Sequence, residues 1–156
     1  MLLLCELRSL TDHVRKLGLI SKGRHNAPIR WLARTVPLEP LLPLFHRLDR
    51  EHFEGTLAPG GIAMVEVRWS DGRMRRTAGL YRSGRYPDGR DLCEIVLSRP
   101  LLEPLPREAT LSTLCHEMIH AWLDRVAGVR EVHGPQFRAR MAVINASQTS
   151  FEVSLR

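Results

Sequence analysis

Hydrophobic residues recur every three or four positions in three parts of the chain, and this spacing predicts amphipathic helices. Each predicted helix has proline in its first turn, where the missing N–H costs little, and Gly128 ends the second one. The predicted helices run from about residue 40 to 53, from 106 to about 127, and from 134 to about 145.

The chain between the first two helices alternates between apolar and polar residues, which is typical of strands with one buried face. Turn-forming residues at 70–72 and 86–89 separate the alternating runs, and a last short strand is expected near the C-terminus. The predicted strands cover residues 62–69, 77–81, 92–98 and 150–155. This order of elements predicts an α+β fold in which a small antiparallel sheet packs on the second helix.

Residues 1–36 differ in pattern from the rest of the chain. Leucine and valine at helical spacing predict a short amphipathic helix there, which Gly18 would end. The stretch 21–34 is basic and has no clear period, as in a mobile arm or linker. We therefore expect a basic, flexible N-terminal segment over 1–36 and one folded domain over 37–156.

Composition narrows the class of protein. A length of 156 residues suits a single domain, and no stretch approaches the roughly 20 apolar residues of a membrane span. Three cysteines without a C-x-x-C pair do not make a disulfide framework and favour a reducing compartment, so we do not expect secretion. Arginine supplies 21 of the 23 basic residues, and the net charge is +6. This favours a nucleic-acid partner, although a genome-wide bias towards arginine codons would give the same composition.

The most specific signal is the pentapeptide 116–120, in which His116 and His120 flank Glu117. Histidines four residues apart lie on one face of a helix, so their ring nitrogens can bind one ion. Glu117 is rotated by about 100° around the helix axis, where its carboxylate can reach a metal-bound water as a general base. Two solvated or core-bonded histidines are the competing interpretation. It is disfavoured because the motif lies in the middle of a strongly amphipathic helix.

A catalytic zinc ion usually has three protein ligands, and three residues downstream are candidates for the third. Asp124 follows on the same helical face, but a third successive turn lies too far along the axis to complete a tetrahedron. His133 lies beyond Gly128, where the chain can turn back, and it is our choice, with Glu131 as the alternative. The remaining histidines are expected to be solvated surface residues; they are His13, His25, His46 and His52.

Two segments, LSTLCHEMIHA at 111–121 and HGPQF at 133–137, resemble the SprT-like domain and, within it, the Spartan DNA-dependent proteases. The resemblance covers roughly residues 40 to 155 in matching order and spacing. Further matching segments are 44–49, 52–57, 65–70, 78–81, 95–102 and 141–145.

The resemblance implies a zincin-like metalloprotease core that binds one zinc ion and digests proteins bound or crosslinked to DNA. It implies His116, His120 and His133 as zinc ligands and Glu117 as the catalytic base. It also implies DNA-protein crosslink repair and activation by DNA, with single-stranded DNA as the expected form. The lack of a long apolar stretch leads us to expect no membrane partner. We expect a monomer in the nucleus of a eukaryote, or otherwise in the cytoplasm or nucleoid.

The sequence departs from Spartan-type proteases because no cysteine follows Cys115 to build their second zinc-binding, DNA-contacting subdomain. The dependence on DNA is therefore open. Arginines of the predicted sheet region are candidate phosphate contacts, and a solvated arginine-rich hairpin is the alternative. These arginines are Arg73, Arg75, Arg76, Arg82, Arg85 and Arg90. Trp69 and Trp122 can stack on bases, but their patterned positions favour core packing.

Two other functions stay open at this point. One is a catalytically idle SprT-like module that uses zinc for stability and its arginines for nucleic acid. The other is a zinc hydrolase that acts on a small molecule or secreted peptide and has no link to nucleic acid.

Overall fold

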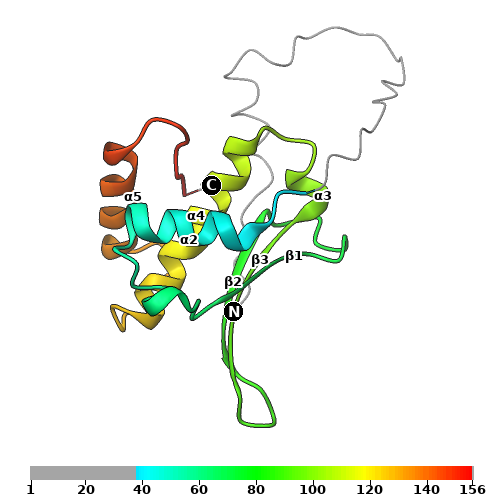
Figure 1. Ribbon diagram of the computed structural model, residues 1–156, viewed down its shortest axis with the longest axis vertical. Coiled ribbons are helices and arrows are strands. Elements are labelled where there is room, and N and C mark those ends of the chain that lie inside the picture. The colour runs from blue at the N-terminus through cyan, green and yellow to red at the C-terminus, as the bar shows by residue number, and fades with distance from the viewer. Residues whose placement is uncertain (1–37, 156) are drawn as a thin grey trace, which may run out of the picture.

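The computed structural model describes residues 38–155 (Figure 1). The helix predicted near the N-terminus, the basic stretch 21–34, His13 and His25 lie outside the described residues. The helices are α2 (Leu41–His52), a 3-10 turn (Pro59–Gly61), α3 (Arg99–Leu102), α4 (Arg107–Arg125) and α5 (Pro135–Ser147), and the strands are β1 (Glu66–Trp69), β2 (Gly79–Arg85) and β3 (Asp91–Leu97). The predicted α+β class is confirmed.

The sheet is mixed, so the prediction of an antiparallel sheet was wrong. Its strand order is β1-β3-β2, with β2 antiparallel and β1 parallel to the central strand β3. The cause is the connection between β1 and β2, which crosses to the other edge of β3 instead of closing a hairpin. Ser98 holds this connection, because its amide donates to Ala78 O at 2.8 Å and its hydroxyl donates to Met74 O at 2.5 Å.

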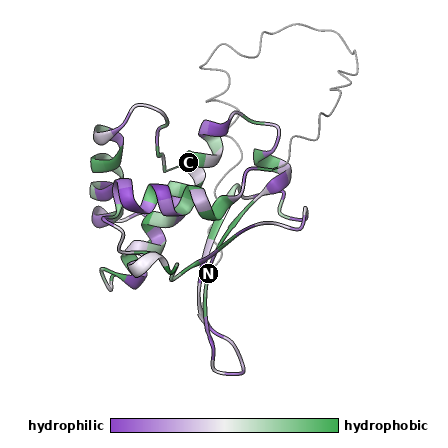
Figure 2. Cartoon of the chain, in the orientation of Figure 1, coloured by the Kyte–Doolittle hydropathy of each residue, from purple (hydrophilic) through white to green (hydrophobic). Residues whose placement is uncertain are grey.

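Helix α4 is the centre of the hydrophobic core. Leu114, Met118 and Ile119 are fully buried in it, and they belong to one apolar cluster with Ile95 of β3 and Phe45 of α2. The β2–β3 hairpin extends away from this core (Figure 1), and its far end is hydrophilic (Figure 2). The core therefore fixes α4 against the root of the hairpin and leaves the tip in solvent.

Several predicted boundaries shift. β1 is shorter and β2 longer than expected, and the proline-rich connection contains the short helix α3, in which the Ser98 hydroxyl accepts from the Leu101 amide. The predicted C-terminal strand does not form. Instead, the Asn145 side chain donates to Val153 O and accepts from Val153 N, both at 2.8 Å. These two bonds satisfy backbone groups that a neighbouring strand would otherwise pair.

The burial of two tryptophans and one histidine can be compared with the sequence predictions. Trp69 and Trp122 pack against the core as expected, with the Trp69 indole donating to Glu39 O at 3.1 Å. His52 does not lie on the surface, since only 5% of its side chain is exposed. It lies at the end of α2, where the helix packs against Phe151.

No helix within residues 38–155 is long and apolar enough to cross a membrane.

Candidate metal centre

Three histidines converge at one point beside α4. His116 and His120 come from consecutive turns of α4, and His133 comes from the loop between α4 and α5. One ring nitrogen of each lies within 4.8 Å of the others, and Nε2 of His133 is 3.1 Å from Nε2 of His116. The sequence-based choice of these three residues is therefore consistent with the geometry.

The separation of the His116 and His133 nitrogens fits two ligands of one metal ion. Donors about 2.0–2.1 Å from a tetrahedral metal are about 3.3 Å apart, close to the separation of the His116 and His133 nitrogens. His116 also has its second ring nitrogen engaged, because Nδ1 donates to Ser154 O at 2.8 Å. This bond leaves Nε2 unprotonated and aimed at the cluster, which is the usual arrangement of a metal-binding imidazole.

Phe137 is the residue of the site that sequence reasoning missed. It was predicted only as a core residue of the last helix, and it is fully buried, but its ring also contacts all three imidazoles. The ring centroids are 4.9 Å from His116, 4.6 Å from His120 and 4.7 Å from His133. The HGPQF segment carried this signal, since it places an aromatic residue four positions after a candidate ligand.

Burial keeps the three imidazoles neutral. It lowers the pKa of His116 to about 4 and that of His120 to about 3, and it also lowers the pKa of His133. Neutral imidazole is the form that binds a metal ion, so burial favours the binding form of these side chains.

The loop that presents His133 is fixed at both ends. Helix α4 ends at Arg125, slightly earlier than predicted, and Gly128 adopts a left-handed conformation with φ +68° in the turn that follows. Glu131, the alternative ligand, is engaged elsewhere: its carboxylate accepts from the Phe137 amide at 2.5 Å. A Cβ atom at Gly134 would overlap this carboxylate, so the close contact depends on glycine. Glu131 thus anchors the loop, and it is not in the cluster.

Glu117 lies against strand β2. Its carboxylate accepts a hydrogen bond from the Tyr81 amide, and its residue is 6% exposed. Burial raises the pKa of Glu117 to about 8, and the bond from Tyr81 opposes that increase. Room for the side chain comes from Gly79, where a Cβ atom would lie 2.6 Å from Glu117 Oε1. A buried acid of raised pKa beside three convergent imidazoles is typical of a functional site.

Asp124 is excluded from the cluster by its own contact. Its carboxylate accepts a hydrogen bond of 2.6 Å from the Tyr81 hydroxyl, one turn beyond His120 on α4. The sequence prediction that Asp124 lies too far along the helix is consistent with this position.

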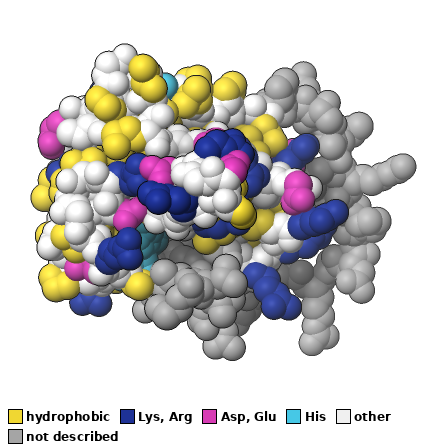
Figure 3. Space-filling view, turned by 90° about the horizontal axis from the view of Figure 1, so that it is seen from below, with side chains coloured by type: hydrophobic (Ala, Val, Ile, Leu, Met, Phe, Trp, Pro, Cys, Tyr) yellow, Lys and Arg dark blue, Asp and Glu magenta, His cyan; other side chains and the backbone are white. Residues whose placement is uncertain are grey.

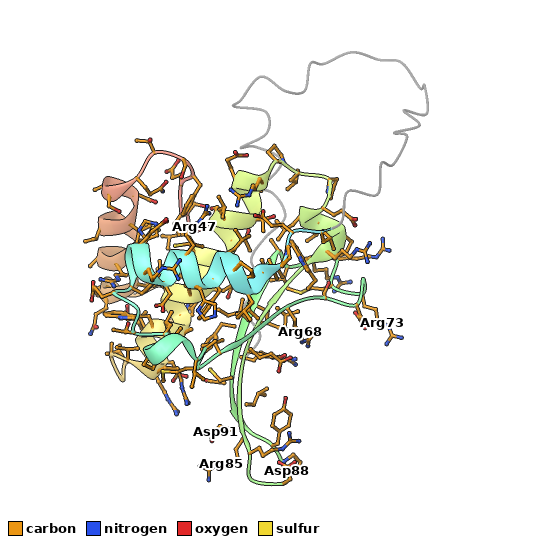
Figure 4. All side chains as sticks on the ribbon, viewed as in Figure 1. Arg47, Arg68, Arg73, Arg85, Asp88 and Asp91 are labelled. Atoms are coloured by element: carbon orange, nitrogen blue, oxygen red, sulfur yellow. The ribbon has the colours of Figure 1, made fainter. Side chains whose placement is uncertain are left out.

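The candidate phosphate-contacting arginines fall into two groups. Arg82, Arg85 and Arg90 lie on the hairpin and pair with Glu94, Asp91 and Asp88, respectively. Arg73 lies at the outer end of the loop after β1 (Figure 4), where 92% of its side chain is exposed and Asp71 is 3.6 Å away. Arg75 and Arg76 are exposed on the same loop, with no ion pair to any residue from 38 to 155. Figure 3 looks onto the hairpin tip and shows acidic side chains next to the basic ones.

The comparison with known proteins decides the family. The model of the SprT-like family matches residues 41–156, which include all of the cluster and Glu117. The chain belongs to the SprT-like family.

Relatives within the SprT-like family carry names that describe an activity. The chain is 42% identical over 116 residues to DNA-dependent metalloprotease dvc-1 of Caenorhabditis elegans. It is 39% identical over 112 residues to DNA-dependent metalloprotease SPRTN of Homo sapiens. Each alignment covers 70% of this chain but only 28% and 21%, respectively, of those longer proteins. The resemblance to DNA-dependent proteases predicted from sequence is confirmed.

Proposed function

We propose that this protein is a zinc-dependent endopeptidase that degrades proteins bound or crosslinked to DNA. The observation that carries the proposal is the convergence of His116, His120 and His133 next to the buried carboxylate of Glu117. The names of the SprT-like relatives support the protease activity and its link to DNA.

The residues divide the chemistry between them. The three histidines would hold one zinc ion through neutral ring nitrogens, with Ser154 O orienting His116. Bound zinc would polarise the scissile carbonyl and lower the pKa of a water molecule. Glu117 would take a proton from the attacking water and pass it to the leaving amine.

The proposed substrate is a protein on DNA, because the relatives are named DNA-dependent and the chain carries a net charge of +6. Arg73, Arg75 and Arg76 are the best-placed phosphate contacts, since they are exposed and at most weakly paired. Arg82 and Arg85 have carboxylate partners, which reduces what they can offer a phosphate. We propose that the protein acts as a monomer at DNA, in the nucleus of a eukaryote, and that single-stranded DNA binds it.

A cleavage assay on the full chain tests the proposal. A labelled histone is incubated with zinc-loaded protein, with and without single-stranded DNA, beside the Glu117→Gln variant. We expect cleavage by the wild type that DNA stimulates, one zinc per chain in both proteins, and loss of cleavage in the variant. The variant keeps the shape of the side chain and removes the base.

The remaining outcomes separate the other functions. Full zinc occupancy and salt-sensitive DNA binding without cleavage would identify an idle binding module. Cleavage that Glu117→Gln retains, or a purified chain without stoichiometric metal, would contradict the proposed mechanism. Cleavage of small peptides that ignores DNA would indicate a hydrolase without a nucleic-acid partner.

A further inference from the structure

Tyr81 contacts α4 at two positions, once through its backbone and once through its side chain. Its amide donates to the Glu117 carboxylate, and its hydroxyl donates to Asp124 Oδ2 at 2.6 Å. Residues seven apart lie on the same face of a helix, two turns and about 10.5 Å from each other. One residue of β2 therefore spans the distance between two carboxylates of the same helical face.

Strand β2 follows this helical face for more than one residue. A Cβ atom at Gly79 would lie 2.7 Å from Thr113 Cγ2 and 2.8 Å from Glu117 Cγ, so the strand backbone lies directly on α4 there. Thr113, Glu117 and Asp124 follow one another along α4, and Gly79 and Tyr81 follow one another along β2. Residues two positions apart on a strand point to the same face, so Gly79 and Tyr81 can both face α4.

Packing at Gly79 alone does not define where β2 lies along α4. Glycine has no side chain to fit a groove, and an amide–carboxylate bond tolerates a small slide of the strand. Pairing with β3 holds β2 in the sheet, and the Tyr81–Asp124 bond adds a direct link from β2 to α4, because a short bond between a phenol and a carboxylate is strong and directional. Burial also raises the pKa of Tyr81, so its hydroxyl keeps the proton that it donates.

We propose that Tyr81 is a positioning residue for Glu117: its hydroxyl, bound to Asp124, ties β2 directly to α4 and thereby holds the β2 backbone against the Glu117 carboxylate. This inference rests on the proposed function, in which Glu117 is the general base. It assigns Asp124 a role as the anchor of the strand on the helix.

The test uses steady-state cleavage of a labelled histone on single-stranded DNA by the full chain, with kcat and KM measured separately. Tyr81→Phe removes only the hydroxyl, and Asp124→Ala removes only its acceptor. We expect each to lower kcat about tenfold, with KM and bound zinc unchanged, because a small displacement of a catalytic group is costly. The double variant should be no slower than either single variant, since both break one interaction.

Two further variants make the readout specific. Asp124→Asn keeps an oxygen that can accept from Tyr81, and it should recover most of the kcat that Asp124→Ala loses. Tyr86→Phe is the matched control, because Tyr86 lies at the exposed end of the same hairpin, and it should cleave like the wild type. Asp124→Asn also tests the inference if Tyr81→Phe fails to fold.

The outcomes distinguish this inference from the function on which it rests. If Glu117→Gln abolishes cleavage while Tyr81→Phe keeps the wild-type kcat, the positioning role is wrong and the protease function stands. A Tyr81→Phe variant that loses zinc in proportion to its activity would likewise overturn the inference, because the tyrosine would then support only the fold. If Glu117→Gln retains cleavage, the proposed function itself fails.

Discussion

Gly79 and Glu117 are in such close contact that a Cβ atom on the glycine would lie 2.6 Å from Oε1 of the carboxylate. Real Cβ atoms do not approach an oxygen this closely, so any side chain at position 79 must displace Glu117. The contact joins β2, an edge strand of the sheet, to Glu117, which follows the candidate metal ligand His116. The absence of a side chain in β2 thus determines where the proposed base lies.

Gly79→Ala is expected to lower cleavage up to about 100-fold, because the new methyl group pushes the carboxylate away from its position. Zinc content, measured by metal analysis, should stay at one ion per chain. Gly84→Ala is the matched control on the same strand, since nothing lies within 4 Å of a Cβ atom there. Wild-type turnover by Gly79→Ala would show that the position of Glu117 against β2 does not matter for cleavage.

Phe137→Ala is expected to weaken metal binding as well as the fold. The ring is fully buried against the three imidazoles, and its removal should cost about 3–5 kcal/mol of unfolding free energy. Without the Phe137 ring the imidazoles gain conformational freedom, which zinc binding must then restrict at a cost in affinity. Chemical denaturation gives the first quantity, and competition with a chelator gives the second.

Phe151→Ala is the control for that experiment, because Phe151 contacts His52 and not the cluster. It should lose stability while its zinc affinity stays near that of the wild type. Equal zinc affinity in Phe137→Ala and the wild type would mean that the ring only fills space.

Replacing the exposed loop arginines should reduce the salt dependence of DNA binding more than replacing hairpin arginines does. Each phosphate contact to a single strand contributes about 0.7 to the slope of log K against log salt. Arg75→Ala with Arg76→Ala should therefore lower the slope by about 1.4. Arg85→Ala with Arg90→Ala should lower it less, since Asp91 and Asp88 already neutralise those side chains. Fluorescence anisotropy at several salt concentrations measures both slopes, and equal changes would contradict this ranking.

A pH-dependent contribution to stability is expected from Glu39 and Arg107, which are joined by two bonds of 2.6 Å at the start of α4. Hydrogen bonding to Arg107 lowers the pKa of Glu39 below its ordinary value of 4.5. A lowered pKa means that the unfolded chain takes up this proton first, so the contribution is present above pH 4.5 and is lost as the pH falls.

The expected size of this contribution is at most about 1 kcal/mol, because both side chains are partly exposed. Glu39→Gln should be less stable than the wild type at pH 7 and equally stable near pH 3, as measured by urea denaturation. Glu66→Gln is the control on the exposed face of β1. A stability difference for Glu39→Gln that does not change with pH would show that the pair acts by packing and not by charge.

The sequence predicted the parts of the site that depend on local spacing. His116, Glu117 and His120 follow from helical periodicity, and His133 follows from its position beyond Gly128, where the chain can turn back. These features are encoded within a few residues of each other. The structure brings the same three histidines together, as that spacing requires.

The parts that the sequence did not predict depend on contacts between distant segments. To predict that β1 pairs with β3 in parallel, one must know that the 70–78 connection crosses to the other edge of β3. Ser98, just after β3, holds that connection through a hydrogen bond to Met74 O, and local spacing does not reveal this contact. The bond from the Tyr81 amide to Glu117 is equally non-local, because 36 positions separate the two residues. Alternation along β2 shows which side chains share a face, but it carries no information about which helix its backbone meets.

The position of β2 at the edge of the sheet has a consequence for aggregation. Edge strands present unpaired amides on which another chain can add a strand, and proteins usually block them with charge or a covering element. Here the carboxylate of Glu117 occupies one of these amides, that of Tyr81. Glu117→Ala would free this amide for a second molecule, whereas Glu117→Gln keeps an oxygen that can accept from it, so self-association is expected in the alanine variant and not in the glutamine variant.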